Sequence, residues 1–338
     1  MTPSLTDAPA STLIARWLPR LLLAALFAFG SEVLLWLEPQ QRPLMDWLYL
    51  IPGYIALATI TLDLAARYCV RNVYDVMLLT AIYGLSAGFL LHPETSLIDF
   101  PRTLATRVLG GHTFIGFEIF GLFLVLTGGA SLRYRRILLG GAFVIGFAWG
   151  IWVRWSPELT DRMAELASLE TMFGVAAIFL LIIAALFLLT SRFSRTVTPP
   201  DFVLSPLEIA GVSIILILIF LVRAAEDAIV VTALLPGAGL ILLCGGIIWS
   251  RESETQHTLL DSHFPPVPLA WSWSLIALFI FSLTAAFVYN RPLVEIAGFN
   301  QLSLVEYVFA GLGFSWLPFV AAIISTRAVD RQYRKLNN

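Results

Sequence analysis

Two carboxylates, Glu32 and Glu118, stand alone inside long apolar stretches of the chain. Neither has an arginine, lysine or histidine within one helical turn before or after it. An ionised side chain at the centre of a bilayer costs about 2.5–3.5 kcal/mol even on lenient insertion scales. Two unpaired acids in such stretches therefore indicate a functional site within a membrane.

We expect both acids to lie roughly 8–9 Å below the outer membrane surface, since a helix rises about 1.5 Å per residue. At that common depth they could share a proton, bind a cation or hold one arginine between them. Arg154 and Arg223 are the candidates for that arginine. The alternative is structural, with each glutamate reaching the interface or meeting a backbone or hydroxyl donor within the bundle.

The other charges within apolar stretches have partners three or four residues away, which is the spacing of helix-end salt bridges. These pairs are Asp63 with Arg67, Asp75 with Arg71, and Arg223 with Glu226 or Asp227. We interpret them as structural.

Metal and cofactor chemistry is not indicated. The topology expected below places His92 and His112 outside but His257 and His263 inside, so the four histidines cannot form one metal site. No phosphate-binding loop, serine-hydrolase elbow, zinc-protease motif or calcium loop occurs. We therefore predict no metal and no cofactor.

The elements that must position these residues are membrane-spanning helices. Of 338 residues, 58% are hydrophobic and 13% are charged, whereas a soluble domain carries about 25% charge. Lipid must act as the solvent instead, which makes the bilayer the predicted partner and leaves no basic surface for nucleic acid. Ten apolar runs occur, at about 14–37, 47–66, 73–91, 112–131, 137–153, 170–190, 207–224, 228–249, 269–289 and 304–326.

The distribution of basic residues predicts the orientation, because loops on the inner side carry the excess of arginine and lysine. With the N-terminus inside, the inner segments hold Arg16, Arg20, Arg67, Arg71, Arg133, Arg135, Arg136, Arg192, Arg195, Arg251, Arg327, Arg331, Arg334 and Lys335. The outer segments hold half as many: Arg42, Arg102, Arg107, Arg154, Arg162, Arg223 and Arg291. We predict a protein of the cytoplasmic membrane with both termini cytoplasmic.

Three parts follow from this topology: a disordered cytoplasmic tail (1–12), an all-α transmembrane domain (13–326) and a basic cytoplasmic tail (327–338). We expect the first span to remain uncleaved. Two outer connectors look amphipathic and are predicted to lie flat on the outer leaflet. One carries Phe100, Leu104 and Val108 at helical spacing, and the other carries Leu159, Met163 and Leu166. Tryptophans near run ends, including Trp36, Trp152 and Trp249, are predicted at the membrane interface.

The ten runs could form two five-helix halves of inverted topology, as in many secondary transporters. The third run of each half carries small residues, 84–88 in the first half and 235–239 in the second. The alternative is that small residues merely allow helices to pack closely.

Three functions are compatible with this pattern. We favour a transporter of a small solute, with proton or cation coupling through Glu32 and Glu118. A membrane enzyme acting on a lipid-linked or envelope substrate from the outer face would use the same acids for acid–base chemistry. A non-catalytic subunit of a membrane complex would have an apolar interior without a cavity.

Overall fold

The computed structural model describes residues 12–37, 42–97, 99–128, 132–155, 168–250, 257–291 and 301–337. Helices make up most of this part of the chain, and no strand occurs within it. The long helices are α1 (Leu13–Ala28), α2 (Leu44–Arg67), α3 (Val73–Ser86), α5 (Thr113–Gly128), α6 (Leu132–Trp155), α7 (Leu169–Phe193), α8 (Pro206–Ala225), α9 (Val231–Trp249), α10 (Trp271–Tyr289) and α11 (Gln301–Asn337).

Shorter elements extend or connect these helices. Three are π-helices, η1 (Phe29–Leu34), η2 (Ala87–Leu91) and η3 (Leu104–His112), which continue α1 and α3 and precede α5 without a break. The others are α4 (Pro93–Ser96) and the 3₁₀ turns η5 (Pro199–Phe202) and η6 (Leu259–Ser262).

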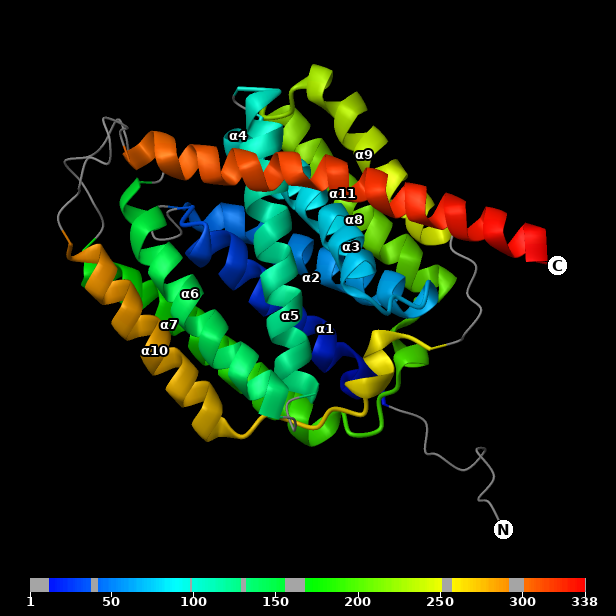
Figure 1. Ribbon diagram of the computed structural model, residues 1–338. Coiled ribbons are helices and arrows are strands. Elements are labelled where there is room, and N and C mark those ends of the chain that lie inside the picture. The colour runs from blue at the N-terminus through cyan, green and yellow to red at the C-terminus, as the bar shows by residue number, and fades with distance from the viewer. Residues whose placement is uncertain are drawn as a thin grey trace, which may run out of the picture.

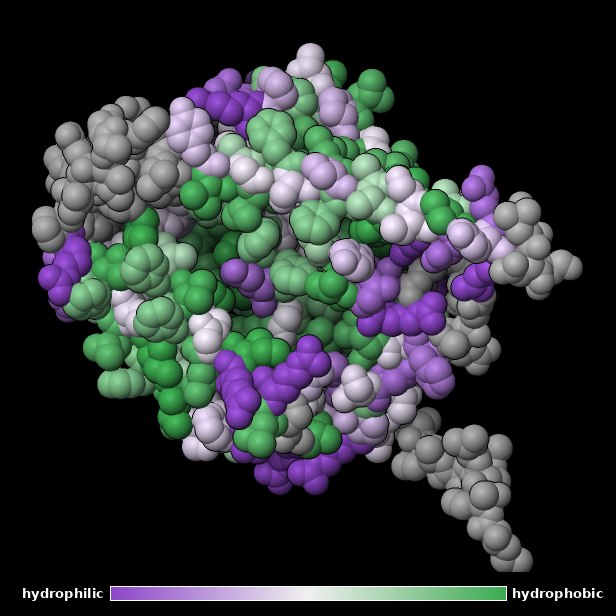
Figure 2. Space-filling model, in the orientation of Figure 1, coloured by the Kyte–Doolittle hydropathy of each residue, from purple (hydrophilic) through white to green (hydrophobic). Residues whose placement is uncertain are grey.

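Ten helical segments in the described ranges are long and apolar enough to cross a membrane, which confirms the predicted all-α bundle of about ten spans. The protein is thus a multi-pass membrane protein by its architecture. Large apolar side chains remain on the outside of α6 to α11, and Figure 2 shows hydrophobic residues over much of one face. An outside of this kind suits a lipid environment.

The buried core is formed mainly by α1, α2, α3 and α5. Packing partners include α1 with α2 and α7, and α3 with α5 and α9. In Figure 1, α6, α7 and α10 lie together on one side, and α11 crosses the bundle and extends beyond it at its C-terminal end. The helix α11 continues through Asn337, so the sequence boundary at 326 is not a break in the helix.

One end of the bundle joins the segments that the charge distribution places inside. The Thr258 hydroxyl donates to the carbonyl oxygen of Ala65 over 3.0 Å, and the Leu259 amide donates to that of Val70 over 2.7 Å. Asp63 pairs with Arg67 at 2.7 Å, as predicted, and also accepts the Leu204 amide at 2.8 Å. These contacts fit the predicted grouping of loops without fixing which side is cytoplasmic.

The connector with Leu104 and Val108 does not lie on a membrane surface. It is η3, Val108 is fully buried, and the segment packs against α11. The flat orientation predicted for it is wrong because its apolar side is covered by protein rather than by lipid. The other predicted connector, with Leu159, Met163 and Leu166, lies outside the described residues.

Two of the tryptophans predicted at the interface, Trp36 and Trp152, are inside the protein. Trp152 donates to the carbonyl oxygen of Leu35 over 2.6 Å and is buried, and Trp36 is fully buried. Trp149 and Trp316 donate in the same way to Val33 and Leu109, over 2.7 and 3.1 Å. A buried carbonyl without a donor would cost several kcal/mol in a membrane, so these indoles stabilise the irregular backbone.

The small-residue stretch 235–239 of the second proposed half packs against η2 of the first half. A Cβ atom on Gly237 of α9 would lie 2.7 Å from Cε1 of Phe89 in η2, so only glycine permits this approach. Close packing therefore accounts for this glycine, and the inverted repeat stays a prediction.

Candidate functional site

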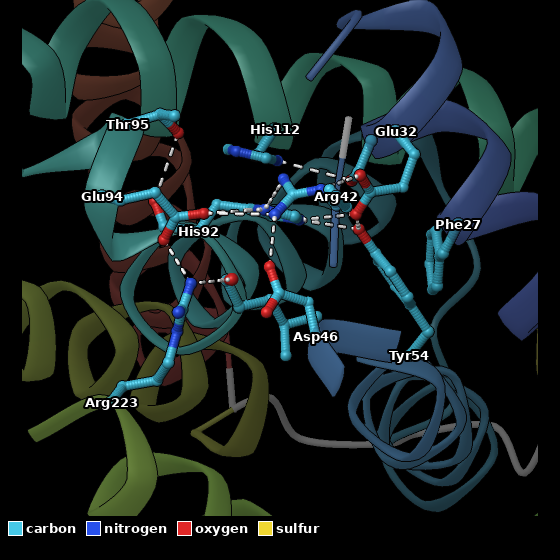
Figure 3. A network of polar contacts seen from close by, with 12 residues as sticks. Phe27, Glu32, Arg42, Asp46, Tyr54, His92, Glu94, Thr95, His112 and Arg223 are labelled. Atoms are coloured by element: carbon cyan, nitrogen blue, oxygen red, sulfur yellow. Dashed lines mark hydrogen bonds and ion pairs between the residues drawn. The ribbon is translucent and has the colours of Figure 1, made fainter. Parts of the chain in front are cut away.

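A network of charged and polar side chains occupies the end of the bundle opposite the segment joined by Asp63 and Thr258. Glu32 lies at its centre with no exposed surface. Its carboxylate accepts hydrogen bonds from Nε of Arg42 and from the hydroxyl of Tyr54, both at 2.9 Å. Nε2 of His92 lies 3.3 Å from the same carboxylate. Figure 3 shows these side chains converging from separate segments of the chain.

Three π-helices bring the chain to this network. Glu32 belongs to η1, His92 directly follows η2, and His112 is the last residue of η3. Single π-helical turns inside α-helices are uncommon and occur frequently at functional sites. The convergence of three such segments is the local backbone feature that distinguishes this end of the bundle.

Arg42 links the buried acid to the surface. Its guanidinium lies 3.5 Å from the carboxylate of Glu94 and 3.8 Å from that of Asp46, in addition to its bond with Glu32. Burial alone would lower the pKa of Arg42, but the charges of Glu32 and Glu94 outweigh that effect and raise the pKa above its usual value. Arg42 is therefore a permanent cation held among three acids, as Figure 3 shows.

The hydrogen bonds around His92 indicate its tautomer. Nη2 of Arg42 lies 3.2 Å from Nδ1 of His92, and since arginine can only donate, Nδ1 must accept. The ring proton is then on Nε2, which lies 2.7 Å from the Tyr54 hydroxyl. This assignment gives a chain of donors from Nε2 of His92 to Tyr54 and from Tyr54 to Oε1 of Glu32.

Glu94 forms the outer edge of the network and is paired with Arg223. Nη1 of Arg223 also bonds Glu226 at 2.9 Å, and its Nη2 donates to the carbonyl oxygen of Leu91 over 2.8 Å. Burial alone would raise the pKa of Glu94. The contact with His92 and the charge of Arg223 outweigh burial and lower the pKa to about 2.

A second group of polar residues lies beside the first. The ring of His112 stacks on that of His92 with centroids 5.1 Å apart, and both rings are buried. Ser31 lies 3.4 Å from Nδ1 of His112 and 3.0 Å from the hydroxyl of Tyr83. A cavity of about 10 Å³ borders His112, which is close to the smallest space that holds one water molecule.

The structure brings only some of the predicted site residues together. Glu32 and Arg223 belong to one network, joined through Arg42 and Glu94, whereas Glu118 does not. Glu118 is half-buried on α5, and within the described part of the chain no hydrogen bond or ion pair reaches its carboxylate. Arg154 falls at the end of α6, but its side chain lies outside the described residues.

Sequence reasoning missed four members of the network: Arg42, Tyr54, His92 and Glu94. Arg42 follows Glu32 by ten residues, so a search of one helical turn could not find it. The usable signal was that Arg42, His92 and Glu94 all fall on the same predicted side of the membrane as Glu32. No protein-family model, curated protein or solved structure matches this chain significantly.

Proposed function

We propose that this chain is a proton-coupled transporter of a small solute in the cytoplasmic membrane, with the network at the outer face as its proton site. The observation that carries the proposal is the fully buried Glu32, bridged by Tyr54 and His92 and reached from the surface through Glu94 and Arg42. Buried ionisable residues in membrane spans commonly mark ion or proton pathways.

The geometry supports a specific proton route. Glu94, on the rim, lies 3.9 Å from Nδ1 of His92, so a proton that enters at the rim can reach this nitrogen once Arg42 moves off it. The protonated ring then passes its Nε2 proton to the Tyr54 oxygen while Tyr54 passes its own proton to Glu32. His92 is left neutral with its proton on Nδ1, and Glu32 becomes a neutral acid.

Proton binding would change the contacts of Arg42. A neutral Glu32 no longer attracts the guanidinium, and Arg42 still has Glu94 and Asp46 nearby. Moving Arg42 toward the rim would loosen the tie between η1 and α4, which is a physical means of linking proton binding to opening of the bundle. The predicted orientation, with both termini cytoplasmic, places this event on the outer side.

Proteoliposomes provide the test. Vesicles that contain the protein are loaded with a pH-sensitive dye, and pools of amino acids, sugars, nucleosides or organic acids are added outside. With the unmodified protein, a pool that contains the substrate should acidify the lumen, because protons enter with the solute. Glu32→Gln should abolish this acidification, Glu32→Asp should retain part of it, and Glu118→Gln should leave it intact. Failure of every pool with folded protein, or acidification by Glu32→Gln, would contradict the proposal.

A second candidate is a non-catalytic subunit of a membrane complex. The observation that favours it is the small size of the cavity beside His112, about 10 Å³, which is too small for any solute. A transporter in an occluded state would also show a closed site. The subunit alternative predicts that no pool acidifies the lumen with the unmodified protein. It also predicts that Glu32→Asp and Glu32→Gln give the same result as each other in this assay.

A further inference from the structure

An open groove of about 300 Å³ lies between the start of α3 and the C-terminal half of α11, at the end of α3 opposite η2 and the proton site. Asn72 and Tyr74 form one wall, and Phe319, Ala322 and Ile323 form the other. Tyr74 and Phe319 are each more than two-fifths exposed, so the groove opens to the outside of the bundle.

One end of the groove is polar and fixed in place. Arg327 lines it and donates to the buried carboxylate of Asp75 over 2.8 Å and to the carbonyl oxygen of Ile247 over 2.9 Å. The partners hold the guanidinium beside Asn72, whose side chain caps α3 by accepting the amide of Asp75. The groove therefore combines an apolar wall with a preorganised cationic end.

The ends of neighbouring helices place this groove near a membrane interface. The helix α3 begins just after Asn72, and α9 ends at Trp249, which is 73% exposed. Exposed tryptophan and tyrosine at helix ends are typical of the headgroup level. Arg331 donates to the carbonyl oxygen of Ser250 over 2.7 Å, so α11 passes this level as well.

The charge around the polar end is positive. Residues 71–75 and 326–334 contain Arg71, Arg327, Arg331 and Arg334 against Asp75 and Asp330 alone. Figure 2 shows hydrophilic side chains gathering beside the C-terminal part of α11, next to the largely apolar face. An anionic headgroup attached to an apolar chain matches both parts of the groove.

We propose that this groove binds one anionic phospholipid from the adjacent leaflet, with an acyl chain along Phe319, Ala322 and Ile323 and the phosphate near Arg327. The surrounding bilayer supplies such a ligand, and the groove is as large as an ordinary ligand site. The proposal does not depend on the proton site, because the two regions share no residue.

The test compares lipids on the purified full-length protein. Tm is measured for the protein in detergent after one of three additions. These are phosphatidylglycerol, phosphatidylcholine, and a mixture of inorganic phosphate and glycerol phosphate. Phosphatidylglycerol at 100 times its Kd should raise Tm by roughly 4 °C over phosphatidylcholine. Native mass spectrometry should show one retained phosphatidylglycerol per chain.

Variants that fill the groove make the test specific. Ala322→Trp and Thr326→Trp change exposed positions that line the groove and should remove the extra Tm shift and the retained lipid. Ile324→Trp is the matched control, because Ile324 is 42% exposed on the same helix and does not line the groove. Equal shifts with both lipids, an intact shift in both filled variants, or a shift with phosphate alone would overturn the proposal.

Discussion

Glu32→Gln should destabilise the protein strongly, although it only replaces a carboxylate by an amide of nearly the same shape. The carboxylate of Glu32 accepts from Arg42 and Tyr54 at 2.9 Å and has no exposed surface. Glutamine keeps one acceptor oxygen but turns a donor amide toward one of those donors. Removing one partner of a buried ion pair costs about 3–5 kcal/mol, since the remaining charge is left without compensation.

The lower end of that range applies here. Arg42 still has Glu94 at 3.5 Å and Asp46 at 3.8 Å, and a tenth of its side chain is exposed. Its charge is therefore still partly compensated in the variant. We expect a loss of about 3 kcal/mol, which corresponds to a fall in Tm of about 4 °C for a protein of this size. Thermal unfolding of the detergent-solubilised protein measures it.

Glu118→Gln provides the matched control, because Glu118 has no partner within the described residues and should change stability by about 1 kcal/mol or less. A double-mutant cycle with Arg42→Gln should give a coupling of about 1–3 kcal/mol, since the two side chains form one pair. The reasoning is refuted if the two glutamine variants have the same Tm. It is also refuted if the effects at positions 32 and 42 add within about 0.5 kcal/mol.

Two further predictions concern helix packing and pH. Gly313→Ala should cost about 1–3 kcal/mol, because its Cβ would clash with the backbone oxygen of Ala105 in η3, while Gly311→Ala meets open space and should be neutral by thermal unfolding. Glu94, with its pKa lowered to about 2 in the folded protein, stabilises the fold fully above its unfolded pKa. Unmodified protein should therefore lose stability relative to Glu94→Gln as pH falls from about 4.5 toward 2, and parallel acid titrations of the two proteins would contradict this.

The ten spans could be predicted from sequence because each depends on a local property, a run of about twenty apolar residues. The Asp63–Arg67 pair was predictable for the same reason, as its members share one helical turn. The grouping of loops at each end followed from the alternation of the spans, and the orientation taken from the charge counts stays a prediction. Features that depend on which helices are neighbours could not be predicted from the sequence.

Asp75 illustrates this failure. The sequence paired it with Arg71, whose backbone amide it does accept at 3.3 Å, but the structure adds the guanidinium of Arg327 from the far end of the chain. Nothing in local spacing connects positions 75 and 327. The same holds for the indole of Trp316, which bonds a carbonyl in η3 and appears in the sequence only as one aromatic among many in its span.

The two acids singled out from sequence show why depth alone does not define a site. Glu32 and Glu118 were predicted at a common level, yet one is enclosed by three ionisable neighbours and the other has none within the described residues. Glu32 lies in the π-helix η1 and contacts Tyr54 of α2 and His92, which follows η2. An α-helix preserves the face on which a side chain lies, whereas a π-helical segment shifts it, and hydrophobic periodicity carries no sign of that shift. The indoles of Trp149 and Trp152 on α6 donate to carbonyl oxygens in and just after η1 and so offset the cost of the irregular backbone.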